Sequence, residues 1–247
     1  MNAVTTTGQN PSSRQNGAAP APASGGVAVR FYERNAGVSL LRGVLGGAEA
    51  LSPRLAERMA QRLFLTPLPL RGFARRSAWG PQWQIERWPF ERVNVCVYRY
   101  RGGADCDEGQ MAVTQRPHVL LMHGWAGRAT QMKALAESLA SEGFVPIVMD
   151  APAHGASNGS TSNLPQFARA LEYVCARLAE QGIKLHAVIA HSLGGSAAAF
   201  ALSRSRLARS LVLIAAPDAP RDYTRMFAHV FGISERTRAA MQRRIEA

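Results

Sequence analysis

The stretch Ala190-His191-Ser192-Leu193-Gly194-Gly195 joins an apolar run, residues 185–190, to an alanine-rich run, residues 194–202. The first run is typical of a buried strand and the second of a helix. A serine between two such elements lies in a very tight turn, whose strained backbone pushes its hydroxyl above the sheet. The residues two positions before and after it must be small, and here they are alanine and glycine. We therefore interpret Ser192 as a nucleophile; the alternative is an ordinary turn with a capping serine.

Two further motifs precede this turn, each at the end of a short apolar run. His123-Gly124-Trp125-Ala126-Gly127 follows the run 119–122, and Asp150-Ala-Pro-Ala-His154-Gly155 follows the run 145–149. In this order, the three motifs resemble the oxyanion loop, the Asp-x-x-x-His-Gly turn and the nucleophile elbow of α/β-hydrolases. An alanine replaces the first glycine of the elbow pattern Gly-x-Ser-x-Gly. The resemblance covers roughly residues 85–220 and points to the branch with esterases, monoglyceride lipases and aminopeptidases.

This resemblance implies an α/β-hydrolase fold, with a mostly parallel sheet and helices on both faces. It also implies acyl transfer, in which Ser192 attacks a carbonyl carbon. The backbone N–H groups of Trp125 and Leu193 would stabilise the oxyanion, because such donors act where negative charge develops. The expected partner is a small molecule with a carboxylic ester or related acyl group, and no cofactor is implied. The Trp125 ring either lines the acyl pocket or only packs in the core.

Each of the three motifs contains a histidine, and one of them could act as the general base. We favour a different role for His123, His154 and His191, in which each hydrogen-bonds within its own loop. Asp150 ends a predicted strand and is expected to cap the loop that follows. The spacing of these residues indicates no metal site.

The family places its triad acid and histidine after the seventh and eighth strands. After residue 217 this sequence instead has a helical pattern, which resembles the start of a helical cap from about residue 220. We therefore expect the C-terminal strands, the acid and the histidine to be missing. Asp218 and His229 follow Ser192 in the required order but are close together, and His229 falls in an amphipathic helical pattern.

A serine without a base is a poor nucleophile. The sequence therefore predicts a serine hydrolase that is inactive and poorly soluble in this form. The alternative is a non-catalytic interaction protein built on a hydrolase-like fold.

The region before the motifs has two parts. Residues 1–29 are rich in Ala, Pro, Ser and Gly, which predicts a disordered tail. Residues 30–78 show helical spacing, with Ser52-Pro53 as a predicted N-cap and first turn, and residues 79–247 are assigned to the hydrolase core. The helical part either packs its apolar stripe on the protein, which we favour, or makes weak membrane-surface contact through residues 37–65.

Composition narrows the possible partners. The net charge is +12, but the arginines are spread from Arg14 to Arg244, which argues against a nucleic-acid partner. The three cysteines are widely spaced and predict no disulfide framework. No uninterrupted apolar run approaches the roughly 20 residues that span a bilayer, and no signal-like segment begins the sequence. A cytoplasmic location is the resulting expectation.

Overall fold

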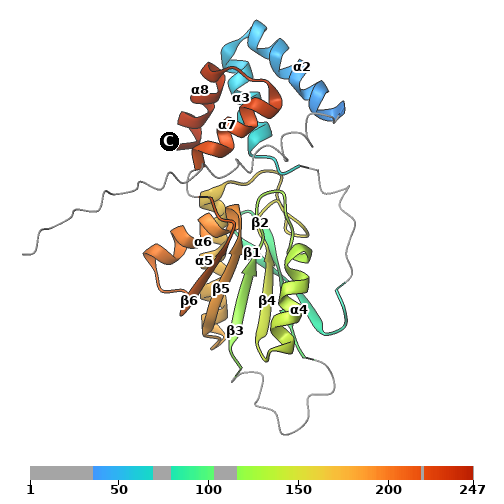
Figure 1. The fold of residues 1–247 in the computed structure, drawn as a ribbon, viewed down its shortest axis with the longest axis vertical. Coiled ribbons are helices and arrows are strands. Elements are labelled where there is room, and N and C mark those ends of the chain that lie inside the picture. The colour runs from blue at the N-terminus through green and yellow to red at the C-terminus, as the bar shows by residue number, and fades with distance from the viewer. Residues whose placement is uncertain (1–35, 69–78, 103–115, 218–219, 247) are drawn as a thin grey trace, which may run out of the picture.

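A computed structural model describes residues 36–68, 79–102, 116–217 and 220–246 of the chain. The predicted disordered tail, residues 1–29, lies outside these ranges. Within the described ranges, a six-stranded sheet carries helices on both faces, and a layer of further helices covers one end of it (Figure 1).

The sheet is mostly parallel, as the sequence predicts. Its strand order is β1-β2-β4-β3-β5-β6. The strands are β1 (Trp83–Phe90), β2 (Val93–Tyr100), β3 (His118–Met122), β4 (Val145–Asp150), β5 (Leu185–His191) and β6 (Ser210–Ile214). β1 and β2 form an antiparallel hairpin, β2 pairs antiparallel with β4, and the remaining pairs are parallel. The three parallel strands β4, β3 and β5 therefore end side by side, at the edge where the three motifs begin.

Helices cover both faces of this sheet because alternate residues of a strand point to opposite faces. In β3, Leu120 and Met122 pack in one cluster, whereas Val119 and Leu121 pack in another. The first cluster lies under α5 (Leu164–Glu180) and α6 (Leu193–Arg204), and the second under η3 (Ala129–Met132) and α4 (Lys133–Ser141). The sequence predicts one helix over 129–141, but its first four residues form a 3₁₀ turn.

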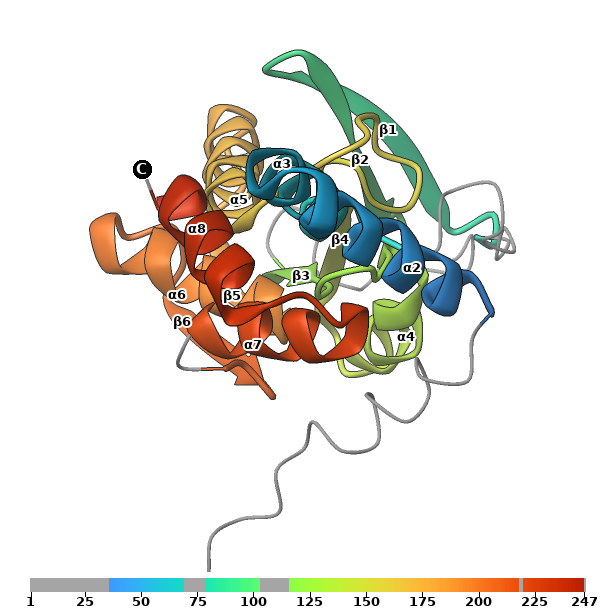
Figure 2. The ribbon, with the colours of Figure 1, turned by 90° about the horizontal axis from the view of Figure 1, so that it is seen from above.

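The layer above the sheet joins helices from the two ends of the sequence, as Figure 2 shows from above. Its members are α2 (Ala36–Leu51), α3 (Pro53–Phe64), α7 (Pro220–Phe231) and α8 (Glu235–Glu246). Leu45 of α2, Ala60 of α3, Phe227 of α7 and Met241 of α8 are buried in one shared cluster. We call these four helices the cap.

Polar contacts also hold the cap together. Arg42 Nε donates to the Val230 carbonyl at 2.5 Å, and the Ser234 hydroxyl donates to Glu49 Oε1 at 2.8 Å. The Ser234 hydroxyl also accepts from the Thr237 N–H at 3.3 Å and so caps the start of α8. Ser52 and Pro53 lie at the predicted N-cap and first-turn positions of α3, although the Ser52 side chain makes no capping hydrogen bond.

β6 forms one edge of the sheet within the described residues, and its side chains are largely exposed. Val212, Leu213 and Ile214 are exposed, whereas the side chains of β3 and β4 are all buried. An exposed apolar edge strand can pair with another chain. Among the described helices, none combines the length and apolar character needed to cross a membrane.

Candidate active site

Ser192 occupies a strained turn between β5 and α6. Its backbone has φ 52° and ψ −126°, a positive φ that non-glycine residues rarely adopt. The Ser192 N–H donates to the Ile214 carbonyl at 2.9 Å, which anchors the turn to β6. Its side chain makes no hydrogen bond that caps α6, and it is half-buried. The turn therefore has the strain that the sequence predicts for a nucleophile, and the capping alternative is not observed.

The His123–Gly127 motif meets this turn because small residues allow the backbones to come very close. A Cβ on Gly194 would lie 2.3 Å from the His123 carbonyl oxygen, and one on Gly195 would lie 2.6 Å from the Ala216 Cβ. A Cβ on Gly124 would lie 2.8 Å from the Ser192 Cβ. Contacts under 3.0 Å are not tolerated without movement, so the glycines set the spacing between the loops.

Trp125 and Leu193, the predicted oxyanion donors, lie on the two loops that meet at Ser192. Leu193 is the first residue of α6, and Trp125 follows the end of β3. In the part of the chain that the structure describes, neither backbone N–H donates to an acceptor within the chain. The positive end of the α6 dipole also favours negative charge at this position. Both N–H groups are therefore available to an external oxyanion.

The carboxyl group of Asp150 ties the loops below the site together. Its Oδ1 accepts from the Ala129 N–H at 2.6 Å, and its Oδ2 accepts from the Ala156 N–H and the Tyr98 hydroxyl, both at 2.8 Å. Burial raises the pKa of Asp150, and the hydrogen bonds to Ala156, Ala129 and Tyr98 oppose that shift. Asp150 therefore caps the loop that follows it, as predicted, and also fixes the start of η3.

Two of the three motif histidines are fully engaged in holding loops. His123 Nδ1 lies 2.7 Å from the Gly124 carbonyl, and its Nε2 accepts from the Ala151 N–H at 3.1 Å. Burial lowers the pKa of His123 to about 4, so the ring is neutral at physiological pH. His154 Nδ1 lies 2.8 Å from the Pro152 carbonyl, and its Nε2 accepts from the Ala126 N–H at 3.1 Å.

Since each Nε2 is an acceptor, the proton of each neutral ring lies on Nδ1 and faces a carbonyl oxygen. His123 and His154 thus act within the loops, as the sequence interpretation favours. His191 is exposed at the end of β5.

A cavity of about 480 Å³ lies between the cap and the Ser192 turn. Apolar side chains dominate its lining. They include Leu63 and Phe64 of α3, Phe227 and Phe231 of α7, and Trp125 and Leu193 of the core. The Trp125 ring also packs edge-on against His154, with 5.0 Å between ring centroids, so Trp125 both lines the cavity and packs in the core.

Tyr223 of α7 is the cap residue that reaches the serine. The Tyr223 phenol lies close enough to the Ser192 side chain to interact with it, and Tyr223 also lines the cavity. Burial raises the pKa of the Tyr223 phenol, so it stays protonated at neutral pH and can donate a hydrogen bond. Sequence reasoning missed this residue. The available signal was its place on the apolar stripe of α7 with Phe227 and Val230, which marks a buried face but not what that face covers.

The possible substitute triad of Asp218 and His229 finds no support in the cap geometry. Asp218 lies outside the described residues. His229 is exposed on α7 and lies six residues after Tyr223, which is about 120° around the helix at 100° per residue. Since Tyr223 faces Ser192, His229 is turned away from it.

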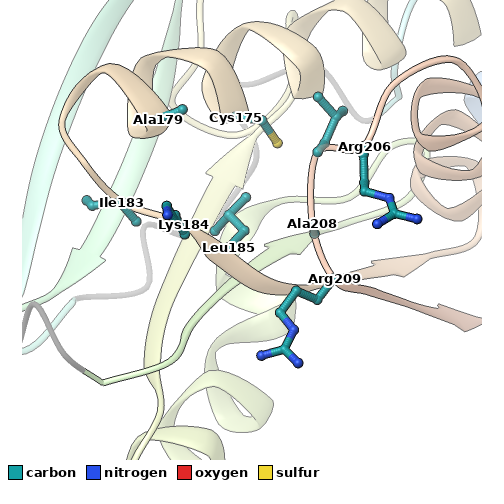
Figure 3. A pocket seen from close by; sticks show the side chains of 9 residues that line it. Cys175, Ala179, Ile183, Lys184, Leu185, Arg206, Ala208 and Arg209 are labelled. Carbon is teal, nitrogen blue, oxygen red and sulfur yellow. The ribbon is translucent and has the colours of Figure 1, made fainter.

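A second cavity lies at the opposite end of the sheet, near the starts of β5 and β6 (Figure 3). Cys175, Lys184, Arg206 and Arg209 line it, and Figure 3 shows Arg206 and Arg209 extending to different sides. Burial raises the pKa of the Cys175 thiol to about 12, which makes it a poor nucleophile. Across the described ranges, no group of three or more His, Cys, Asp or Glu residues is arranged to hold a metal ion.

Several solved structures are similar in fold. A predicted CIB-like hydrolase from Thermoplasma acidophilum has 15% identity and a TM-score of 0.44, with 57% of this chain and 68% of that one covered. An esterase from Pyrococcus furiosus has 18% identity and a TM-score of 0.45, with 57% and 56% covered. An epoxide hydrolase from Vigna radiata has 15% identity and a TM-score of 0.44, with 58% and 44% covered.

This chain therefore spans about half to two thirds of the length of these three structures. No curated protein sequence matches it. The family model described as "Alpha/beta hydrolase family" matches residues 119–245, which is just over half of the chain and includes all three motifs. The chain belongs to the alpha/beta hydrolase family.

Proposed function

We propose that this protein is a serine hydrolase that acts on a carboxylic ester or a related acyl substrate, with Ser192 as its nucleophile. The observation that carries the proposal is the backbone of Ser192, held at φ 52° in the turn that faces the cavity. Strain of about 1–3 kcal/mol persists only where the surrounding structure enforces it, and it is concentrated at functional sites. Close approach by Gly124, Gly194 and Gly195 enforces it here.

In the proposed reaction, Ser192 Oγ attacks the carbonyl carbon and its proton passes to a general base, a role that the family gives to a histidine and that we assign to none of the described residues. The carbonyl oxygen becomes an oxyanion, which the N–H groups of Trp125 and Leu193 stabilise; one such donor contributes about 3 kcal/mol in known cases. Collapse of this intermediate breaks the bond to the leaving group and leaves an acyl-serine, which water then hydrolyses. The loop that carries Trp125 is held by His154, which accepts from the Ala126 N–H, and by Asp150, which accepts from the Ala129 N–H just after it.

The cavity supports an apolar acyl group as the part of the substrate that is buried. Its volume of about 480 Å³ falls within the range of about 300–1,000 Å³ that is usual for small-molecule sites. Leu63, Phe64 and Phe227 offer no charge to a carboxylate or ammonium group. We therefore expect esters of apolar acids to bind better than esters of charged acids.

Tyr223 favours a second candidate, a binding protein without turnover. The phenol next to Ser192 has a raised pKa, so it does not accept the serine proton at neutral pH. A hydrogen bond to this phenol could instead hold an uncharged acyl ligand beside an unactivated serine. This candidate predicts binding of an apolar ester that is neither cleaved nor transferred to Ser192.

Covalent labelling separates the two candidates. Incubation with a fluorophosphonate, followed by mass spectrometry, should locate the adduct on Ser192, and Ser192→Ala should abolish it. Ser203→Ala, which changes an exposed serine on the same helix, should label like the unaltered protein. An adduct on another serine would exclude Ser192 as the nucleophile. Binding of a p-nitrophenyl ester without adduct or hydrolysis would favour the non-catalytic candidate.

A further inference from the structure

Helix α2 presents an exposed face without charge. Leu40, Val44 and Leu51 are 69%, 45% and 82% exposed and recur at helical spacing. Gly47 lies on the same stripe, and nothing lies within 4 Å of the position that a Cβ would take there. Together these four residues define what we call the α2 stripe. Isolated exposed leucines are ordinary, but a continuous uncharged stripe along a surface helix requires an explanation.

The charged residues of α2 are both used inside the cap. Arg42 donates to the Val230 carbonyl, and Glu49 accepts from Ser234. The buried apolar residues Val38, Leu45 and Ala48 face the same way. The helix thus has two apolar sides, and its charges lie on the side that faces the protein. A helix that only packed on its own cap would have the reverse pattern, with charges towards water.

Helix α3, which follows α2 and packs against it, carries exposed basic side chains. Arg54, Arg58 and Arg62 recur every four residues along it, and all three are exposed. Leu55 is 44% exposed on the same outer side. The acidic residue of α3, Glu57, faces α8, where Arg244 lies 3.4 Å away. The α2–α3 pair therefore presents an exposed apolar stripe on one helix and an exposed row of arginines on the helix packed against it.

We propose that the α2 stripe and the arginine row of α3 dock on an anionic lipid surface. An amphipathic helix binds in the interface plane when apolar side chains reach the acyl boundary and cations meet anionic head groups. Figure 1 places α2 and α3 at the end of the molecule away from the base of the sheet, so the surface can approach without obstruction by the described core. The net charge of +12 adds long-range attraction to such a surface.

A second copy of the chain fits this face less well. A symmetric dimer brings the same patch of each copy together. The arginine rows of both copies would then lie near one another and repel, whereas anionic head groups neutralise them. The lipid surface is therefore the occupant that complements both halves of the patch.

Vesicle sedimentation tests the proposal with the full chain. It should sediment with vesicles of phosphatidylcholine and phosphatidylglycerol, less with phosphatidylcholine alone, and less at high salt. Gly47→Glu should weaken partitioning by at least about tenfold, because a carboxylate must be desolvated and is repelled by the head groups. The control, Gly47→Gln, should partition onto the vesicles within about twofold of the unaltered protein. Arg58→Ala, which removes one cation from α3, should weaken partitioning about fivefold.

Neither substitution at Gly47 meets a neighbour, so both proteins should keep the unfolding temperature or exceed it. Equal partitioning of the Gly47→Glu and Gly47→Gln proteins, or no partitioning of the unaltered chain, overturns the proposal. The molecular mass in the absence of lipid could also double as protein concentration rises, but not in the Gly47→Glu protein. That result would identify the face as a self-association surface and would also overturn the proposal.

Discussion

Glycines have opposite roles in the serine turn and in α2. In the turn, a Cβ on Gly194 would lie 2.3 Å from a backbone oxygen, so only glycine allows the loops to meet. In α2, nothing lies within 4 Å of the position that a Cβ would take at Gly43, Gly46 or Gly47, so packing does not require a glycine at any of them. The comparison shows that the turn is built for closeness between backbones. The outer side of α2 is uncharged and open.

The largest expected effect on stability comes from a substitution that forces the backbones at the serine turn apart. In Gly194→Ala the new methyl group must displace the His123 backbone, which cannot move aside as a flexible side chain would. We expect the free energy of unfolding to fall by about 3 kcal/mol, the upper part of the range for overpacking. Urea unfolding at pH 7 measures it. A loss below about 0.5 kcal/mol would show that the loops can separate, and the contrast with α2 would fail.

A second prediction concerns the neutral His123 ring under this turn. Its pKa is about 4 in the folded chain and about 6.5 when unfolded. Between these values the unfolded state binds the proton and the folded state does not, so stability is lost as pH falls from 6.5 towards 4. Unfolding free energy should drop by about 2 kcal/mol between pH 7 and pH 5 through this group.

The control for this prediction is His123→Gln, whose side chain does not titrate. His118, whose pKa is lowered by burial, and Asp150, 3.8 Å from His123, titrate in both proteins. The difference between the two pH slopes therefore isolates His123. Parallel slopes would contradict the neutral, buried ring. No titratable side chain lies on the α2 stripe, so changes there should leave the pH slope unaltered.

The sequence predicts the structure correctly where neighbouring residues along the chain determine it. The apolar runs on either side of Ser192 predict the strand and the helix. The positive φ is expected because the two elements are joined at Ser192 by a very tight turn. The prediction fails where a residue far away in the sequence determines the local structure. The helix over 129–141 begins as a 3₁₀ turn, where Asp150 holds the Ala129 N–H from another loop. The Ser52 N–H bonds to the Ala48 carbonyl, so the backbone of α2 continues up to the start of α3.

The cap is the part that no local pattern could place. Leu63 of α3 and Tyr223 of α7 line one cavity although they are far apart in sequence. Helical spacing identifies the apolar side of each helix, but several surfaces could cover each side. Nor does that spacing reveal that α2 is apolar on both sides, because this depends on Arg42 finding a partner in α7 and Glu49 finding one in Ser234, just before α8.

The smallest expected effect is on the open side of α2, where Gly46→Ala should stabilise the protein. Glycine in a helix interior costs about 1 kcal/mol relative to alanine, because its backbone loses more freedom on folding. The added methyl group meets nothing within 4 Å, so no packing penalty offsets the gain. The unfolding temperature should rise by about 2–4 °C for a chain of this size. A glycine-to-alanine substitution at Gly194 should instead lower the unfolding temperature. The opposite signs at Gly46 and Gly194 test the contrast between α2 and the serine turn most directly. A fall in unfolding temperature for Gly46→Ala would show that a Cβ at this position does meet an obstacle, and the contrast with Gly194 would then fail.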